Sequence, residues 1–149
     1  MIFDVTVPQF IKMLNNLSAL LDKAAQYADG KKVDPEVLLQ SRLALDQFTL
    51  GRQIQIACDT AKLSVFRLTG KEAPSHPDTE KTLPEFKTRI QSTVDYLKTF
   101  KPEDFAQSAQ TRVTTPRWDG QYLFNKKMMI QHALPNFYFH ITTAYSILR

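Results

Sequence analysis

Cysteine and glycine are both scarce in this sequence. One cysteine, Cys58, and four glycines occur in 149 residues. A single cysteine cannot form a disulfide within the chain, which favours a reducing compartment. So few turn glycines argue against an all-β or Rossmann-type fold. Cys58 stands between an alanine and an acid in an apolar helical pattern with no local base, which favours a core cysteine over a nucleophile.

Long apolar runs and clustered basic charge are also missing. No segment approaches the ~18 apolar residues of a membrane span, and residues 1–8 do not resemble a signal peptide. The net charge is +4, but the lysines are dispersed. We therefore expect no membrane partner, no nucleic-acid partner and a cytoplasmic location. The length predicts one domain over residues 1–149.

Apolar residues recur at helical spacing in four long segments. The segments are 7–28, 49–68, 83–100 and 125 to the chain end. Thr6 is the expected N-cap of the first helix, with Pro8 in its first turn and Asp29-Gly30 at its end. A short helix over 36–41 and a loop over 72–82 are also expected, and Pro135 predicts a kink or restart in the last helix.

Residues 112–124 have a different composition from the rest. β-Branched and aromatic residues flank Asp119-Gly120, a favoured hairpin turn pair, and Pro116 confines the hairpin to an edge. Asn125 is the expected cap of the last helix. Four amphipathic helices with a short β-hairpin before the last predict an all-α four-helix bundle.

The last helix carries a polar stripe on an otherwise apolar pattern. Asn136, His140 and Thr143 follow one another at i, i+4 and i+7, with His132 one turn earlier. A helix bundle places binding sites on such stripes. We expect the stripe to face the helix of residues 49–68, where Gln55 and Asp59 share a face.

Two segments resemble a known family. Arg52-Gln-Ile-Gln-Ile-Ala-Cys-Asp-Thr-Ala-Lys62 and Trp118–Arg149 are similar to the DinB/YfiT-like superfamily, and within it to an uncharacterised, mostly bacterial domain of unknown function. The resemblance implies a DinB-like four-helix bundle. It also implies a metal site with two histidines at i, i+4 on the last helix and a third on helix two. Here His140 matches the second histidine, Asn136 replaces the first, and helix two has none.

These departures leave two function classes open. One is a non-catalytic or degenerate-site module for binding or stress response, without a cofactor. The other is a divergent metal-dependent transferase or hydrolase, resembling thiol S-transferases, with His140 as ligand or general base and Asp59 or Gln55 as its partner. A site of Asp59, Asn136 and His140 would bind a divalent ion weakly. Alternatively, Asn136 and His140 are a buried hydrogen-bonded pair.

Three further expectations concern the surface. Phe137, Tyr138 and Phe139 point ~100° apart, so they cannot all face one core; we expect a homodimer, unless the 72–82 loop covers the outward ring. Lys62 is expected to pair with Asp59 on the surface and His76 to be solvated. The last helical pattern has no cap, which leaves room for a further C-terminal tail.

Overall fold

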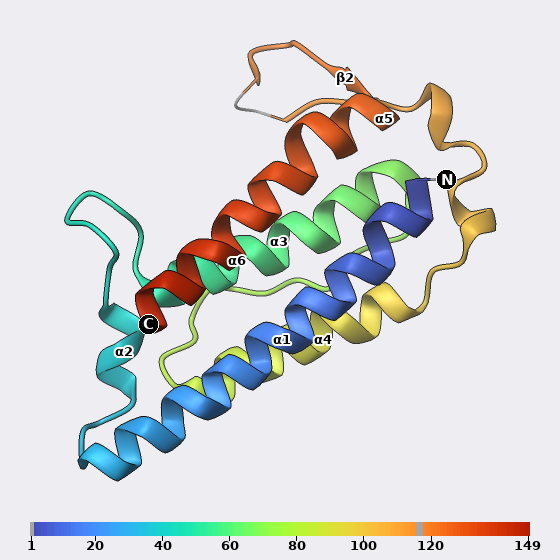
Figure 1. The fold of residues 1–149 in the computed structure, drawn as a ribbon. Helices are drawn as coiled ribbons and strands as arrows, with labels where there is room; N and C mark the ends of the chain where they lie inside the picture. Colours follow the sequence, from blue (N-terminus) through green and yellow to red (C-terminus); the bar gives the residue numbers. More distant parts are fainter. Residues whose placement is uncertain (1, 116–117) are drawn as a thin grey trace.

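The chain folds as a four-helix bundle in a computed structural model that describes residues 2–115 and 118–149. The four long helices are α1 (Ile2–Lys31), α3 (Leu50–Thr69), α4 (Leu83–Lys98) and α6 (Leu134–Leu148). α1 and α6 run in one direction and α3 and α4 in the other (Figure 1). α3 packs on α6 and on α4, while α1 packs on α4 and on α6. The predicted all-α fold is confirmed.

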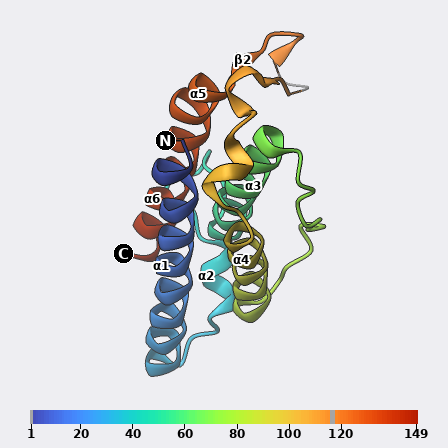
Figure 2. The ribbon, with the colours of Figure 1, turned by 90° about the vertical axis from the view of Figure 1, so that its right-hand side faces the viewer.

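α3 and α4 are parallel, so the chain must return along the bundle between them. Residues 71–82 make this crossover, which runs along the outside of α3 and α4 (Figure 2). α3 is capped at both ends. Thr49 accepts a hydrogen bond from the N–H of Arg52, and Gly70 has a φ of 76°. α4 begins with a capping box of Thr82 and Glu85.

α1 is longer than its sequence predicts. It begins at Ile2, so Thr6 lies inside the helix and donates its hydroxyl to the Ile2 carbonyl at 2.6 Å. Pro8 is likewise interior, and the helix ends at Lys31 rather than at Asp29-Gly30. The cause is distant packing: the ring of Phe3 lies 5.7 Å from that of Phe105 and holds the extra turn against the bundle.

The core fills the space between the four helices. Phe10 of α1 and Phe137 of α6 pack edge to face, with ring centroids 4.6 Å apart. Cys58 is fully buried within this core, and burial raises the pKa of its thiol to about 12. It is therefore a core cysteine, as its sequence context indicates. Among the described residues, no helix is both long and apolar enough to cross a bilayer.

Short elements connect the long helices. α2 (Glu36–Gln40) follows α1, and η1 (Pro102–Phe105) and η2 (Ser108–Gln110) follow α4. The predicted hairpin forms from β1 (Arg112–Val113) and β2 (Leu123–Phe124), which pair antiparallel. Asp119 and Gly120 both have positive φ in its turn. The prediction for Pro116 falls outside the described residues.

The last helical run has three parts. α5 (Asn125–Lys127) leads into a π-helical segment, η4 (Met128–Ala133), and then into α6 without a break. The wider turn directly precedes Pro135, whose missing N–H already leaves a gap in the hydrogen-bond ladder. Asn125 is the first helical residue rather than the cap, because its side chain is turned inward to Ser108.

Candidate functional site

The polar stripe of α6 lies against α3. His140 and Thr143 are buried, and Asn136 is half-buried. The Nδ1 of His140 donates to the Oε1 of Gln53 at 2.6 Å, and the Nδ2 of Asn136 donates to the Oγ1 of Thr60 at 2.9 Å. The Thr143 hydroxyl donates back to the Phe139 carbonyl. The stripe therefore meets two polar side chains that are one i, i+7 step apart on α3.

Those two side chains are not the ones that the sequence suggested. Gln55 is turned toward the crossover, where its Nε2 donates to the Oε2 of Glu80 at 3.0 Å. Asp59 forms ion pairs with Arg89 at 2.7 Å and Lys62 at 3.1 Å. Sequence spacing gave the correct helix, but Gln55 lies on the wrong side of it, ~200° around the helix from the observed partner of His140, Gln53.

His140 is held as a neutral imidazole with a defined tautomer. The Nε2 of Gln53 donates to the Phe48 carbonyl at 3.3 Å, which turns its Oε1 toward the ring of His140. Because that oxygen only accepts, Nδ1 carries the proton and Nε2 is an acceptor. Burial, followed by the nearby cation of Arg52, lowers the pKa of His140 to about 4.

A cleft of about 520 Å³ opens above this pair, between α3, the end of η4 and the hairpin. Asn136, His140 and Asp59 all line it. Aromatic groups also contribute: the ring of Trp118 from the hairpin lies 5.0 Å from that of His132, in edge-to-face contact. The cleft therefore joins the polar stripe to a half-buried aromatic wall.

Arg67 is the charged residue of the cleft that lacks a counterion. It is half-buried, and burial lowers the pKa of its guanidinium, with no compensating carboxylate. No described carboxylate forms an ion pair with it, whereas Arg52 pairs with Asp78 at 2.7 Å. Sequence analysis missed Arg67, since nothing in its local pattern distinguishes it from a solvated arginine.

A second polar cluster lies under the crossover, and its charges have oppositely charged partners. Arg89 of α4 is only 2% exposed and pairs with Asp59, Asp78 and Glu80 at 2.7–2.8 Å. This ion cluster connects α3, α4 and the crossover. We infer that this cluster stabilises the fold rather than binding a ligand, because its ions already have partners.

Lys62 pairs with Asp59 as expected, but it is not on the surface, and the expectation of a solvated His76 was wrong. Lys62 is buried, and its ammonium donates to the Pro74 carbonyl at 2.9 Å and to the Nδ1 of His76 at 2.8 Å. His76 is half-buried and reaches the Ser92 hydroxyl with its other nitrogen. The crossover folds over both residues, which no local pattern could indicate.

The residues of the cleft do not fit the metal ion that the superfamily implies. Within residues 2–115 and 118–149, no three His, Cys, Asp or Glu side chains converge on a possible ion. His140 offers one nitrogen, Asn136 is an uncommon ligand, and Asp59 is occupied by two cations. The Arg52 cation beside His140 would also repel a metal.

A bundle of four long helices, with a hairpin before the last and a polar cleft between the second and last, defines a DinB-like protein. A family model described as a domain of unknown function (DUF1993) matches residues 2–149, and the chain belongs to this family. The chain is similar to a solved structure of a DinB family member from Shewanella denitrificans, at 57% identity and a TM-score of 0.95. That match covers 100% of this chain and 85% of the other. A search of the curated proteins finds no match.

Proposed function

We propose that this protein is a non-catalytic binding module and that the cleft between α3 and α6 binds a small organic anion. The observation that carries the proposal is Arg67, a half-buried cation without a counterion at the cleft wall. Removing a charge from water is costly unless the charge is paired. A carboxylate or phosphate would supply the missing partner through charge-assisted hydrogen bonds.

The remaining wall favours a ligand with a planar apolar body. Trp118 and Phe48 line the cleft, and the volume of about 520 Å³ lies in the range of small-molecule sites. The acceptor Nε2 of His140 and the amide of Asn136 offer polar contacts deeper in the cleft. An aromatic carboxylate or aromatic phosphate has this combination of properties.

The hydrogen bonds and burial of the polar side chains favour ligand binding over metal-dependent transfer chemistry. The Thr143 hydroxyl is bonded to a backbone carbonyl, and Cys58 is buried in the core. His140 is fixed by an amide rather than by a carboxylate that could stabilise its protonated form. These contacts support a module that binds a ligand. We also propose that the protein is cytoplasmic, in keeping with its single cysteine.

Benzoate and phenyl phosphate, with benzamide as the neutral control, test this proposal. Trp118 is the single tryptophan of the chain, so its fluorescence reports on the cleft, and calorimetry gives the affinities. At least one anion should bind saturably and more tightly than benzamide. Arg67→Gln should weaken that binding about tenfold or more, since a charged hydrogen bond is worth roughly 1.5–3 kcal/mol. Arg149→Gln, which removes the same charge elsewhere, should change nothing.

Three outcomes would overturn the proposal. They are the absence of saturable anion binding, equal affinity for benzoate and benzamide, and an Arg67→Gln variant that binds as the wild type does. Metal analysis of protein purified without a histidine tag provides an independent arm. A stoichiometric divalent ion would favour the transferase class, because only that class needs one.

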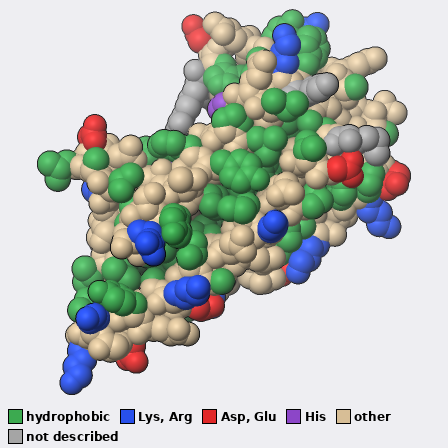
Figure 3. Space-filling view, viewed as in Figure 1, with side chains coloured by type: hydrophobic (Ala, Val, Ile, Leu, Met, Phe, Trp, Pro, Cys, Tyr) green, Lys and Arg blue, Asp and Glu red, His purple; other side chains and the backbone are tan. Residues whose placement is uncertain are grey.

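We also propose that the protein forms a homodimer through the outer face of α6. Phe137 is fully buried, whereas Phe139 is 52% exposed, so the consecutive aromatic rings do separate between core and surface. The outward residues Tyr138, Phe139 and Tyr145 border two shallow grooves that share Thr142. Hydrophobic side chains gather where α6 lies beside α1 (Figure 3). An apolar face of this kind favours a two-fold contact.

A further inference from the structure

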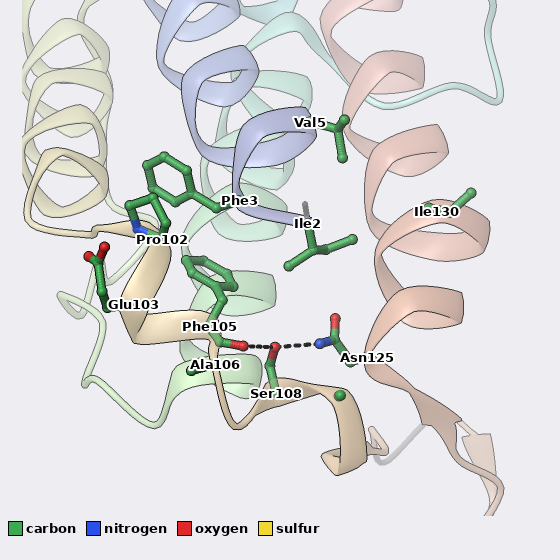
Figure 4. Close-up of a pocket in the computed structure, with 11 residues that line it drawn as sticks. Ile2, Phe3, Val5, Pro102, Glu103, Phe105, Ala106, Ser108, Asn125 and Ile130 are labelled. Atoms are coloured by element: carbon green, nitrogen blue, oxygen red, sulfur yellow. Dashed lines mark hydrogen bonds between the residues drawn. The ribbon is translucent and has the colours of Figure 1, made fainter.

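A second, larger cavity shares none of its lining residues with the cleft. It has a volume of about 910 Å³ and lies between the beginning of α1, the η1–η2 segment and the start of the last helical run (Figure 4). Its lining is mostly apolar and includes Ile2 and Phe3 from α1, Phe105 from η1 and Ile130 from η4. The one charged lining residue among those described is Glu103, which is exposed.

Two buried polar side chains, Ser108 and Asn125, interrupt this apolar lining. Asn125 is 5% exposed, and its Nδ2 donates to the hydroxyl of Ser108. The Oδ1 of the same amide is buried and has no hydrogen-bond partner among the described residues. In Figure 4 this oxygen is turned away from Ser108, toward the side on which Ile2 and Ile130 lie.

The orientation of the amide follows from the proton of Ser108. The Ser108 hydroxyl donates its single proton to the Phe105 carbonyl at 2.5 Å. Its oxygen can therefore only accept from Asn125, which requires Nδ2 on that side. The opposite orientation would set two acceptors against each other. The free oxygen is thus a buried acceptor by necessity, on a residue that lines the apolar cavity.

An unpaired buried acceptor costs roughly 1–3 kcal/mol, and native proteins leave few of them. One water molecule could satisfy the oxygen, but it would leave most of this apolar cavity unfilled. We propose that the cavity binds an elongated apolar molecule with a terminal hydroxyl group, whose O–H donates to the Oδ1 of Asn125. The apolar body lies against Ile2, Phe3 and Phe105.

The polarity of the site selects a neutral donor. A single amide oxygen satisfies one hydroxyl, but it does not repay the desolvation of an ammonium group. A carboxylate would place two acceptors against an acceptor, and the exposed Glu103 at the rim would repel it. An alcohol fits the free oxygen and the apolar wall together, independently of any ligand in the α3–α6 cleft.

The test compares two probes of similar length by NMR titration of ¹⁵N-labelled protein. 1-Octanol can donate a hydrogen bond, whereas 2-octanone can only accept one. The Asn125 side-chain amide should shift with 1-octanol, which should bind about fivefold more tightly than 2-octanone, as expected for one net hydrogen bond. Asn125→Leu should remove this preference. Asn15→Leu, an identical change at an exposed position of α1, should keep it.

Ala109→Phe provides a second variant if Asn125→Leu does not fold. Ala109 is exposed and lines the cavity, so a larger side chain there should block both probes without disturbing the core. Equal affinities of the wild type for the two probes would overturn the proposal. So would full binding by Ala109→Phe, shifts confined to the α3–α6 cleft, or a cavity covered by a second copy of the chain in a dimer. Benzoate binding at Arg67 is measured separately, so the two proposals fail independently.

Discussion

Gly51 of α3 lies directly against the ring of Phe86 of α4. A Cβ at Gly51 would lie 2.9 Å from the Cζ of Phe86 and 3.5 Å from the Leu39 carbonyl oxygen. A Cβ contact of 2.9 Å is shorter than any ordinary one, so the absence of a side chain sets how closely the two parallel helices approach.

Gly51→Ala should therefore destabilise the protein. Alanine gains about 1 kcal/mol of helix propensity, but overpacking in a filled core costs roughly 1–3 kcal/mol. We expect a net loss of about 1 kcal/mol in the free energy of unfolding, measured by urea denaturation. Gly30→Ala is the matched control, since nothing lies within 4 Å of its Cβ position inside α1, and it should stabilise the protein. A neutral or stabilising Gly51→Ala would show that Phe86 moves aside freely.

His140 should make the stability depend on pH. Its folded pKa of about 4 is below the 6.5 of an unfolded histidine, so the unfolded chain binds more protons between these values. The stability gained from neutral His140 is complete above pH 6.5 and is lost as the pH falls toward 4. The full loss amounts to about 3 kcal/mol, at 1.36 kcal/mol per pKa unit.

Urea denaturation between pH 7 and pH 4.5 measures this effect. The His140→Gln variant should lose stability less steeply than the wild type over that range. His76 and His132 also have lowered pKa values, caused first by burial and then by nearby cations. The wild type must therefore be compared with a single variant of each of the three histidines. An NMR titration that gave His140 a pKa near its unfolded value would contradict the prediction.

Among the charged residues, substitution of Arg89 should lower the free energy of unfolding most. Arg89→Met leaves the carboxylates of Asp59, Asp78 and Glu80 close together without their shared cation. Removing one partner of a buried ion pair costs roughly 3–5 kcal/mol, and the partial exposure of the carboxylates reduces this to about 2–3 kcal/mol. Limited proteolysis should then cut within the crossover. Lys98→Met, which removes an exposed lysine 3.7 Å from Asp95, should change stability by less than about 0.5 kcal/mol.

The assembly prediction concerns Phe139. Light scattering at micromolar concentration should give a mass about twice the 17.1 kDa of one chain. Phe139→Glu should shift the protein to the monomer, because it places a charge on the apolar outer face of α6. Tyr27→Glu on α1, whose ring is 65% exposed, should leave the mass unchanged. A wild-type protein that is monomeric throughout would end the homodimer hypothesis.

The sequence predicts those parts of the fold that depend on nearby residues. The limits of α3 follow from Thr49 and Gly70, whose capping interactions are made with the adjacent turn. The start of α1 does not follow, because the local signal of Thr6 and Pro8 is overridden by Phe105, about one hundred positions away in sequence.

In the candidate site, too, local features are predictable from the sequence and distant contacts are not. Helical periodicity identifies Asn136 and His140 as a stripe, but periodicity alone cannot tell which side of α3 faces them. That rotation is set by packing of the whole bundle, and it selects Gln53 and Thr60. The free acceptor of Asn125 depends on the proton of Ser108, 17 positions earlier, and is visible only in three dimensions.

The contact between Gln53 and His140 joins residues 87 positions apart. The ribosome therefore makes α3 long before it makes the helix that covers it. Until α6 emerges, the amide of Gln53 lacks its imidazole partner and Phe10 lacks the ring of Phe137. Until then, an apolar face of α1 and α3 is exposed to water in the nascent chain. Chaperones bind surfaces of this kind.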